Sequence, residues 1–256
     1  MYEVWLNGRG LQDISASIRI VDVQEETPKL ELQLIDLCHL DGQRMASRRT
    51  QSRKVKVRFV VREEEPLRRR LLLDEVLRWV ADGQLTTSAR EGQYIEVKYT
   101  TLPNLSSVKG WAEVLEVTFT ALAPYWQASD ETAAEVQTEA NAVKSGTLCP
   151  PGTAGSAFLT FRMQNLSTEV LNTASVAVNG RSFLFTALGL EAGKTLVCDY
   201  DANGFLRLMA EGESKMNKRT GASADNLVLG LCQSNTVSVQ TDRAARVRLC
   251  ARGQWL

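Results

Sequence analysis

The stretch FTALAPYW at residues 119–126 constrains the fold more than any other part of the chain. An alternating strand pattern runs there directly into Pro124 and two aromatic residues, close to the midpoint of the sequence. The residues that follow are mostly small and polar. This pattern indicates the last strand of one domain followed by its exit. With 256 residues, the chain has the length of two ordinary domains, and we place their boundary at this exit.

Composition excludes several classes of protein. The 30 basic and 30 acidic residues leave no net charge, whereas a nucleic-acid binder needs a concentrated basic face. No apolar run is long enough to span a membrane. The first residues, MYEVWLNGRG, lack the basic and apolar regions of a secretory signal. We therefore expect a chain made and folded in a cytoplasm, with no nucleic-acid sequence recognition and no membrane partner.

The cysteines and the single histidine give no metal or catalytic pattern. The only histidine is His39, which follows Cys38 directly, and neighbours on a strand point to opposite faces. No C-x-x-C pair occurs, so a zinc site is not expected. We expect buried, reduced thiols that act as small hydrophobes. The five cysteines are Cys38, Cys149, Cys198, Cys232 and Cys250.

The first half has the pattern of a β-sheet interrupted by one helix. Apolar residues alternate over residues 14–23, 30–37, 53–61, 94–99 and 111–121. Such strands bury one face and expose the other. In the last of them we expect the buried face to carry Leu115, Val117, Phe119 and Ala121. Residues 41–53, DGQRMASRRTQSR, are predicted to form a long, exposed, basic loop.

Residues 66–82, PLRRRLLLDEVLRWVAD, predict the helix. Pro66 suits a first helical turn, and Gly83 marks the expected end. The apolar stripe predicts that Leu72, Val76 and Val80 anchor the helix to the sheet. The basic run at residues 68–70 is either a solvated face or a contact between subunits.

From residue 128 to 155 the sequence is polar and contains several glycine and proline residues, which interrupt helices and strands. This composition predicts a connecting segment. The second half has about seven short β runs separated by turn residues, which is typical of a β-sandwich or jelly roll. Asn179-Gly180 predicts a two-residue type I′ hairpin turn, since both residues accept a positive φ.

In order and spacing, these elements resemble the phage distal tail protein family of siphophage-type tails. The resemblance covers nearly the whole chain. In the first half it rests on RKVKVRFVV, LLLDEVLRWVADG, EGQYIEVKY and VTFTALAPYW. In the second half it rests on NTASVAVNGRSFLF, GLEAGKTLVCDYDANGFLRL and a late NTVSV. The family's LxPGxN turn before the last strands is only approximated by LGLCQSNTVSV.

The resemblance implies a mainly β fold: a split-barrel-like, ring-forming domain over residues 1–127, a connecting segment over 128–155, and a galectin-like β-sandwich over 156–256. It implies a structural protein of the virion tail tip that forms a hexameric ring. The implied partners are the tail tube protein, a tail hub or tail-associated protein, the tape measure protein and a receptor-binding protein. The arginines expected to contact other subunits are Arg44, Arg48, Arg49, Arg53, Arg68 and Arg69.

Two rival functions remain open at this stage. A carbohydrate-binding protein that acts in host-surface recognition would use exposed aromatic residues of the second half, for which Tyr200, Phe205 and Trp255 are the candidates. A hydrolase would use paired acids such as Asp199 and Asp201. However, these acids flank a turn, where Asp serves to form the turn. We therefore expect no catalytic residue.

A bound cofactor is not expected either. The stretch GLEAGKT at residues 189–195 ends like a phosphate-binding loop. It has one residue too few between its glycines, and it joins two β runs instead of opening a helix. We predict a loop between strands at this place.

Overall fold

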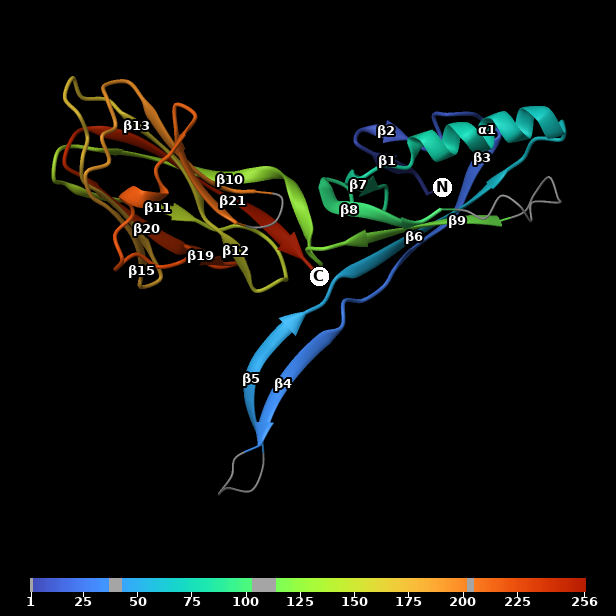
Figure 1. The fold of residues 1–256 in the computed structure, drawn as a ribbon, viewed down its shortest axis with the longest axis horizontal. Coiled ribbons are helices and arrows are strands. Elements are labelled where there is room, and N and C mark those ends of the chain that lie inside the picture. Colours follow the sequence, from blue (N-terminus) through green and yellow to red (C-terminus); the bar gives the residue numbers. More distant parts are fainter. Residues whose placement is uncertain (1, 37–42, 103–113, 202–204) are drawn as a thin grey trace. The chain divides into compact units, whose positions relative to one another are not determined.

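The computed structural model describes residues 2–36, 43–102, 114–201 and 205–256. They form two compact units, Met1–Ser129 together with Leu256 (unit 1) and Asp130–Trp255 (unit 2). Figure 1 shows that the described part of the chain is mainly β, with a single α-helix in its first half. The expected fold class, mainly β with one early helix, is confirmed.

Unit 1 is built on seven antiparallel strands in the order β2-β1-β7-β8-β9-β6-β3. Strand β8 pairs with β7, with β9 and with the first residues of β10, so it joins the two halves of the sheet. The strands are β1 (Val4–Leu6), β2 (Arg9–Gly10), β3 (Ile18–Glu25), β6 (Arg53–Val61), β7 (Gly83–Thr87), β8 (Gln93–Thr101) and β9 (Val114–Ala121).

The core of unit 1 lies on the apolar face of β6 and β9. The predicted inward face of β9 is confirmed, because Leu115, Val117, Phe119 and Ala121 are all buried. The ring of Trp79 meets the ring of Phe119 edge-on, with centroids 6.2 Å apart. This contact fixes the end of the helix against the sheet.

Helix α1 (Pro66–Trp79) begins at the predicted proline but ends three residues earlier than expected. Val80 already has an extended backbone, and Gly83 belongs to β7 with φ +143°. The buried residues inside the helix are Leu73, Val76 and Trp79, whereas the predicted anchor Leu72 is only half-buried. No helix among the described residues has the length and apolar character to cross a membrane.

Strands β4 (Leu30–Asp36) and β5 (Gln43–Thr50) form a two-stranded hairpin of their own. In Figure 1 this hairpin stands clear of the other strands of unit 1. The sequence predicted a half-buried strand followed by a long loop. The loop prediction is wrong over residues 43–50, because these residues pair with β4 from Leu30↔Thr50 to Asp36↔Gln43. Residues 37–42, which include Cys38 and His39, lie outside the described residues.

Unit 2 is a β-sandwich. One sheet has the order β18-β17-β16-β13-β21-β10 and the other β11-β20-β14-β15. Phe161 of the first sheet meets Phe185 of the second at 6.5 Å in an edge-on contact, and both are buried. The first sheet contains β10 (Trp126–Thr138), β13 (Thr160–Asn165), β16 (Thr195–Tyr200), β17 (Leu206–Ala210), β18 (Glu213–Ser214) and β21 (Ala245–Trp255).

The second sheet contains β11 (Val143–Leu148), β14 (Ala174–Val178), β15 (Arg181–Phe185) and β20 (Asn235–Thr241). Strands β12 (Ser156–Phe158) and β19 (Val228–Gly230) form a separate pair. Asn179 and Gly180 join β14 to β15 with φ values of 50° and 75°, which confirms the predicted turn.

The segment expected to connect the domains differs from the prediction. Residues 128–155 contain most of β10 and all of β11, and both strands are part of the sandwich. Val136 and Leu148 from these strands lie in the core of unit 2. The segment is rich in polar residues because every side chain over residues 129–135 of β10 is exposed or half-exposed.

Candidate functional site

The most exposed apolar side chains of unit 1 include those of the β4–β5 hairpin. Leu32 and Leu34 are each 49% exposed, Ile35 is 53% exposed and Met45 is 55% exposed. Leu34 and Ile35 are adjacent on one strand, so apolar side chains project from both faces of the hairpin. A soluble chain rarely leaves such a patch uncovered, which makes the hairpin a candidate contact surface.

A cluster of charged and aromatic side chains holds the root of this hairpin. Glu25, the last residue of β3, accepts hydrogen bonds from Arg90 Nη2 at 2.9 Å and Arg90 Nε at 3.3 Å. The indole N–H of Trp126 donates to Glu25 Oε2 at 3.0 Å, and Arg53 Nη1 lies 3.4 Å from the same oxygen. We call Glu25, Arg53, Arg90 and Trp126 the Glu25 cluster. It ties together β3, β6, the β7–β8 turn and the start of β10.

Electrostatics make Glu25 the central member of the cluster. Arg53 is only 3% exposed. Burial lowers the pKa of the Arg53 guanidinium and nearby Arg90 acts in the same direction, whereas Glu25 opposes the shift. The Arg90 guanidinium also lies over the Trp126 ring, 5.3 Å from its centroid. Glu25 therefore supplies the negative charge that offsets the repulsion between the guanidinium groups of Arg53 and Arg90.

A crevice of about 500 Å³ opens beside the cluster. Its walls come from the end of β3, the strands of the hairpin and the β7–β8 turn. They include Glu25, Glu26, Pro28, Thr50, Arg53 and Arg90. The root of the hairpin within unit 1 is therefore hollowed and lined by charged side chains.

The arginines expected to contact other subunits fall into different environments. Arg44 lies on β5 and is exposed. Arg48 and Arg49 also belong to β5, but their side chains lie outside the described part. Arg68 is 71% exposed and pairs with Glu65, and Arg69 is half-exposed.

Arg53 differs from these residues. It is buried in the Glu25 cluster, so it belongs to the interior of unit 1 and not to its exposed surface.

The candidate sugar contacts do not form one site. Tyr200 stacks on Phe158 with ring centroids 4.5 Å apart, so a side chain of this protein already covers one of its faces. Burial raises the pKa of the Tyr200 hydroxyl. Phe205 is 69% exposed, and Trp255 is half-exposed in β21.

The acidic pairs considered for hydrolysis take part in surface ion pairs. Asp199 receives two hydrogen bonds from Arg207, at 2.8 and 2.9 Å. A second closely spaced acidic pair in this half is Glu211 and Glu213, and Glu211 pairs with Lys194 at 2.6 Å. Residues 189–194 lie between β15 and β16, Thr195 begins β16, and the stretch opens no helix, as predicted. Among the described residues, no group of three or more His, Cys, Asp or Glu side chains could hold a metal ion.

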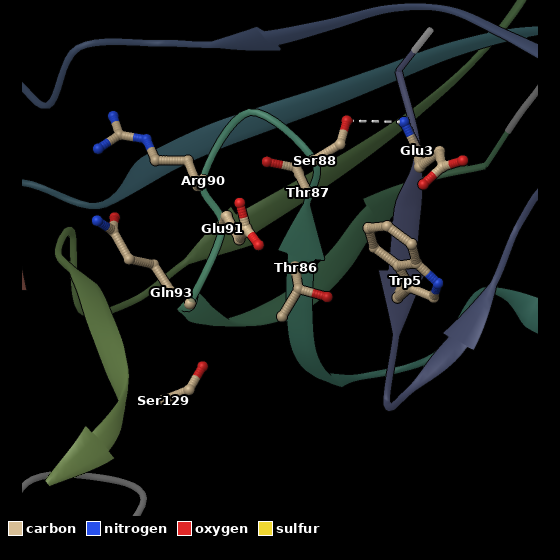
Figure 2. A pocket seen from close by; sticks show the side chains of 10 residues that line it. Glu3, Trp5, Thr86, Thr87, Ser88, Arg90, Glu91, Gln93 and Ser129 are labelled. Atoms are coloured by element: carbon tan, nitrogen blue, oxygen red, sulfur yellow. Dashed lines mark hydrogen bonds between the residues drawn. The ribbon is translucent and has the colours of Figure 1, made fainter.

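A second crevice, of about 440 Å³, lies on unit 1 beside the β7–β8 turn. Figure 2 shows that Trp5 of β1 and Thr86 of β7 line it together with Glu3, Ser88, Glu91, Gln93 and Ser129. The backbone N–H of Glu3 donates to Ser88 Oγ at 3.0 Å, which ties the start of β1 to the turn.

Sequence reasoning missed the Glu25 cluster and this crevice. Both bring together residues that are far apart in the chain, such as Glu25 and Trp126, or Trp5 and Thr86. The one available signal was Trp126 itself, a fully buried tryptophan that ends the stretch predicted as the exit.

Comparisons of sequence identify no relative. No family model matches the chain, and no curated protein sequence matches it. The fold, in contrast, matches known structures. A chain of the phage P2 baseplate in its activated conformation with calcium matches with a TM-score of 0.50 and 8% identity, over 98% of this chain and 97% of that chain.

The SPP1 Dit protein matches with a TM-score of 0.71 and 11% identity, over 98% of this chain and 99% of that chain. It is described as a paradigm of the hub adsorption apparatus in phages that infect Gram-positive bacteria. The chain therefore has the fold of SPP1 Dit, a phage distal tail protein, which confirms the sequence resemblance at the level of the fold.

Proposed function

We propose that this protein is a structural, non-enzymatic component of a phage tail tip, in which copies of unit 1 form a ring. The observation that carries the proposal is the match to SPP1 Dit, which extends over nearly the full length of both chains. A shared fold alone does not establish a shared role. The exposed hairpin of unit 1 is the independent feature that supports assembly.

The hairpin supports assembly because it is poorly explained in a single chain. A two-stranded hairpin is marginally stable in water unless it packs against something else. β4 and β5 pair only with each other, according to the described residues, and their apolar side chains are about half exposed. A second copy of the chain is the partner we propose. A head-to-tail contact between different surfaces of identical copies closes into a ring when the rotation allows it.

The proposed partners follow the same division into two units. Unit 1 would form a hexameric ring that continues the tail tube and surrounds the tape measure protein. Unit 2, the sandwich, would hold the tail hub or tail-associated protein and the receptor-binding protein. Its two-sheet architecture offers exposed strand edges, such as β11, where Val143 is 61% exposed. The site of action would be the tip of the virion tail.

The full chain with Leu32→Ser and Leu34→Ser tests the role of the hairpin. These side chains are half exposed in the single chain, so their loss should leave the thermal midpoint nearly unchanged. We expect the variant to lose subunits, measured as particle mass by light scattering. The matched control is Val143→Ser, which removes an apolar side chain from unit 2 that is even more exposed, at 61%. A double variant that assembles like the unaltered chain would contradict the role of the hairpin.

A further inference from the structure

One outward face of unit 1 carries a row of side chains across four strands. Trp5 of β1 is opposite Thr86 of β7, and Tyr94 of β8 is opposite Gln127 of β10. Leu85 of β7 is opposite Ile95 of β8, and the two strands are antiparallel. The following residue of β7, Thr86, is therefore opposite Tyr94 of β8. Residues directly opposite each other share one face of a sheet. The row therefore runs Trp5–Thr86–Tyr94–Gln127, and we call it the Trp5 row.

The Trp5 row faces outward. The neighbouring residues of the same strands, such as Val4, Leu85 and Ile95, are buried on the opposite face. All four members of the row are half-exposed. The Tyr94 hydroxyl donates to Gln127 Oε1 at 3.0 Å, which steadies one end of the row.

The spacing of the two aromatic rings is set by the sheet. Trp5 and Tyr94 are two strands apart, which corresponds to about 10 Å between their strand axes. That is the length of two pyranose rings joined in an extended chain. An aromatic ring presents a flat apolar face, and the C–H face of a pyranose is its chemical complement.

The crevice beside the row is lined by both polar and apolar surface, and most of its lining residues carry polar side chains. Trp5 and Thr86 belong both to the row and to this crevice of about 440 Å³. Trp5 is the one aromatic side chain among the described residues that line it. The hydroxyl and carboxylate groups come from Glu3, Ser88, Glu91 and Ser129 (Figure 2). One aromatic ring surrounded by hydrogen-bonding groups is the lining expected for a ligand rich in hydroxyls.

We propose that the Trp5 row and the adjoining crevice bind a neutral, extended carbohydrate chain of β-1,4-linked pyranoses. Trp5 and Tyr94 stack on alternate sugars, and Glu3 and Glu91 accept hydrogen bonds from hydroxyl groups.

A protein partner would need more apolar surface than one tryptophan, since the centre of a protein interface is depleted in charge. An anionic polymer is disfavoured because Glu3 and Glu91 are exposed, while the nearby Arg90 is bound to Glu25.

The test uses the full chain, with cellohexaose and chitohexaose as extended probes and maltohexaose as a curved one. Titrations followed by calorimetry and tryptophan fluorescence should show binding of at least one extended probe, and weaker binding of maltohexaose. Trp5→Ala should weaken binding by about tenfold or more, and Trp5→Phe by less. Trp255→Ala, in unit 2, is the matched control and should leave the affinity unchanged.

Two results would overturn the proposal. One is that neither extended probe binds at millimolar concentration. The other is that Trp5→Ala and Tyr94→Ala keep the unaltered affinity while their thermal midpoints show folded protein. Neither result would bear on ring formation, which rests on the match to SPP1 Dit and on the hairpin and is read from particle mass.

Discussion

The indole N–H of Trp126 donates a hydrogen bond to the carboxylate of Glu25 at 3.0 Å, although 101 positions separate the two residues in the chain. Trp126 is fully buried, and it is the residue at which β10 begins. Glu25 ends β3, just before the chain enters the exposed hairpin. One carboxylate therefore fixes both the root of the hairpin and the exit of the chain from unit 1.

Replacing Glu25 by alanine should destabilise unit 1. The change leaves the buried Arg53 guanidinium and the Trp126 N–H without their partner. We expect a loss of about 2–4 kcal/mol in the free energy of unfolding, since the cluster is only partly shielded from solvent. Urea denaturation followed by tryptophan fluorescence measures it.

The control for this change is the next residue. Glu26 is exposed and forms an ion pair with Lys56 at 2.8 Å. Glu26→Ala should leave the urea midpoint almost unchanged. If Glu25→Ala and Glu26→Ala unfold at the same urea concentration as the unaltered chain, the Glu25 cluster does not stabilise the root of the hairpin.

Helix α1 should tolerate charge on one face only. Val76 is fully buried, whereas Leu71 on the same helix is 54% exposed. Val76→Asp places an unpaired charge in the core and should cost about 3–5 kcal/mol. Leu71→Asp should cost little. Thermal unfolding of both variants, monitored by circular dichroism, separates the two faces, and equal midpoints would be inconsistent with the packing described.

The cysteines should differ in reactivity. Cys149 is exposed, and Cys198 is buried with a pKa that burial raises, so its thiol stays protonated at mildly alkaline pH. Iodoacetamide at pH 8, followed by peptide mass mapping, should modify Cys149 rapidly. Cys198 should react only after denaturation. Cys232 is exposed, but its Sγ lies 3.1 Å from Gly152 O, so it should react more slowly than Cys149. Rapid labelling of Cys198 in the folded chain would contradict its burial in the core of the sandwich.

Local patterns predicted the local structure well. The alternation at residues 114–121 identifies the buried face of β9, because that strand packs against a core on one side. Asn179-Gly180 identifies its turn, because few other residue pairs accept two positive φ values. The turn depends on neighbouring residues alone, and the prediction for β9 succeeds because a core does pack on the apolar side of that strand.

Contacts between distant segments could not be predicted in the same way. Leu30, Leu32 and Leu34 alternate as a half-buried strand would, yet β4 projects from unit 1, since burial depends on what packs above a strand and not on the strand itself. The polar residues of β10 predicted a linker because most of its side chains are exposed, although the strand pairs within the sandwich. The Glu25 cluster and the Trp5 row depend on the register between strands far apart in the chain, which no local pattern encodes.

Ring formation is the central claim, and the particle mass and shape of the purified full chain test it most directly. Light scattering at tens of micromolar, combined with negative-stain electron microscopy, gives both. The account predicts a mass of six copies of the 28.4 kDa chain and rings with an open centre. A particle with the mass of one chain at that concentration, with no rings in the images, would contradict it.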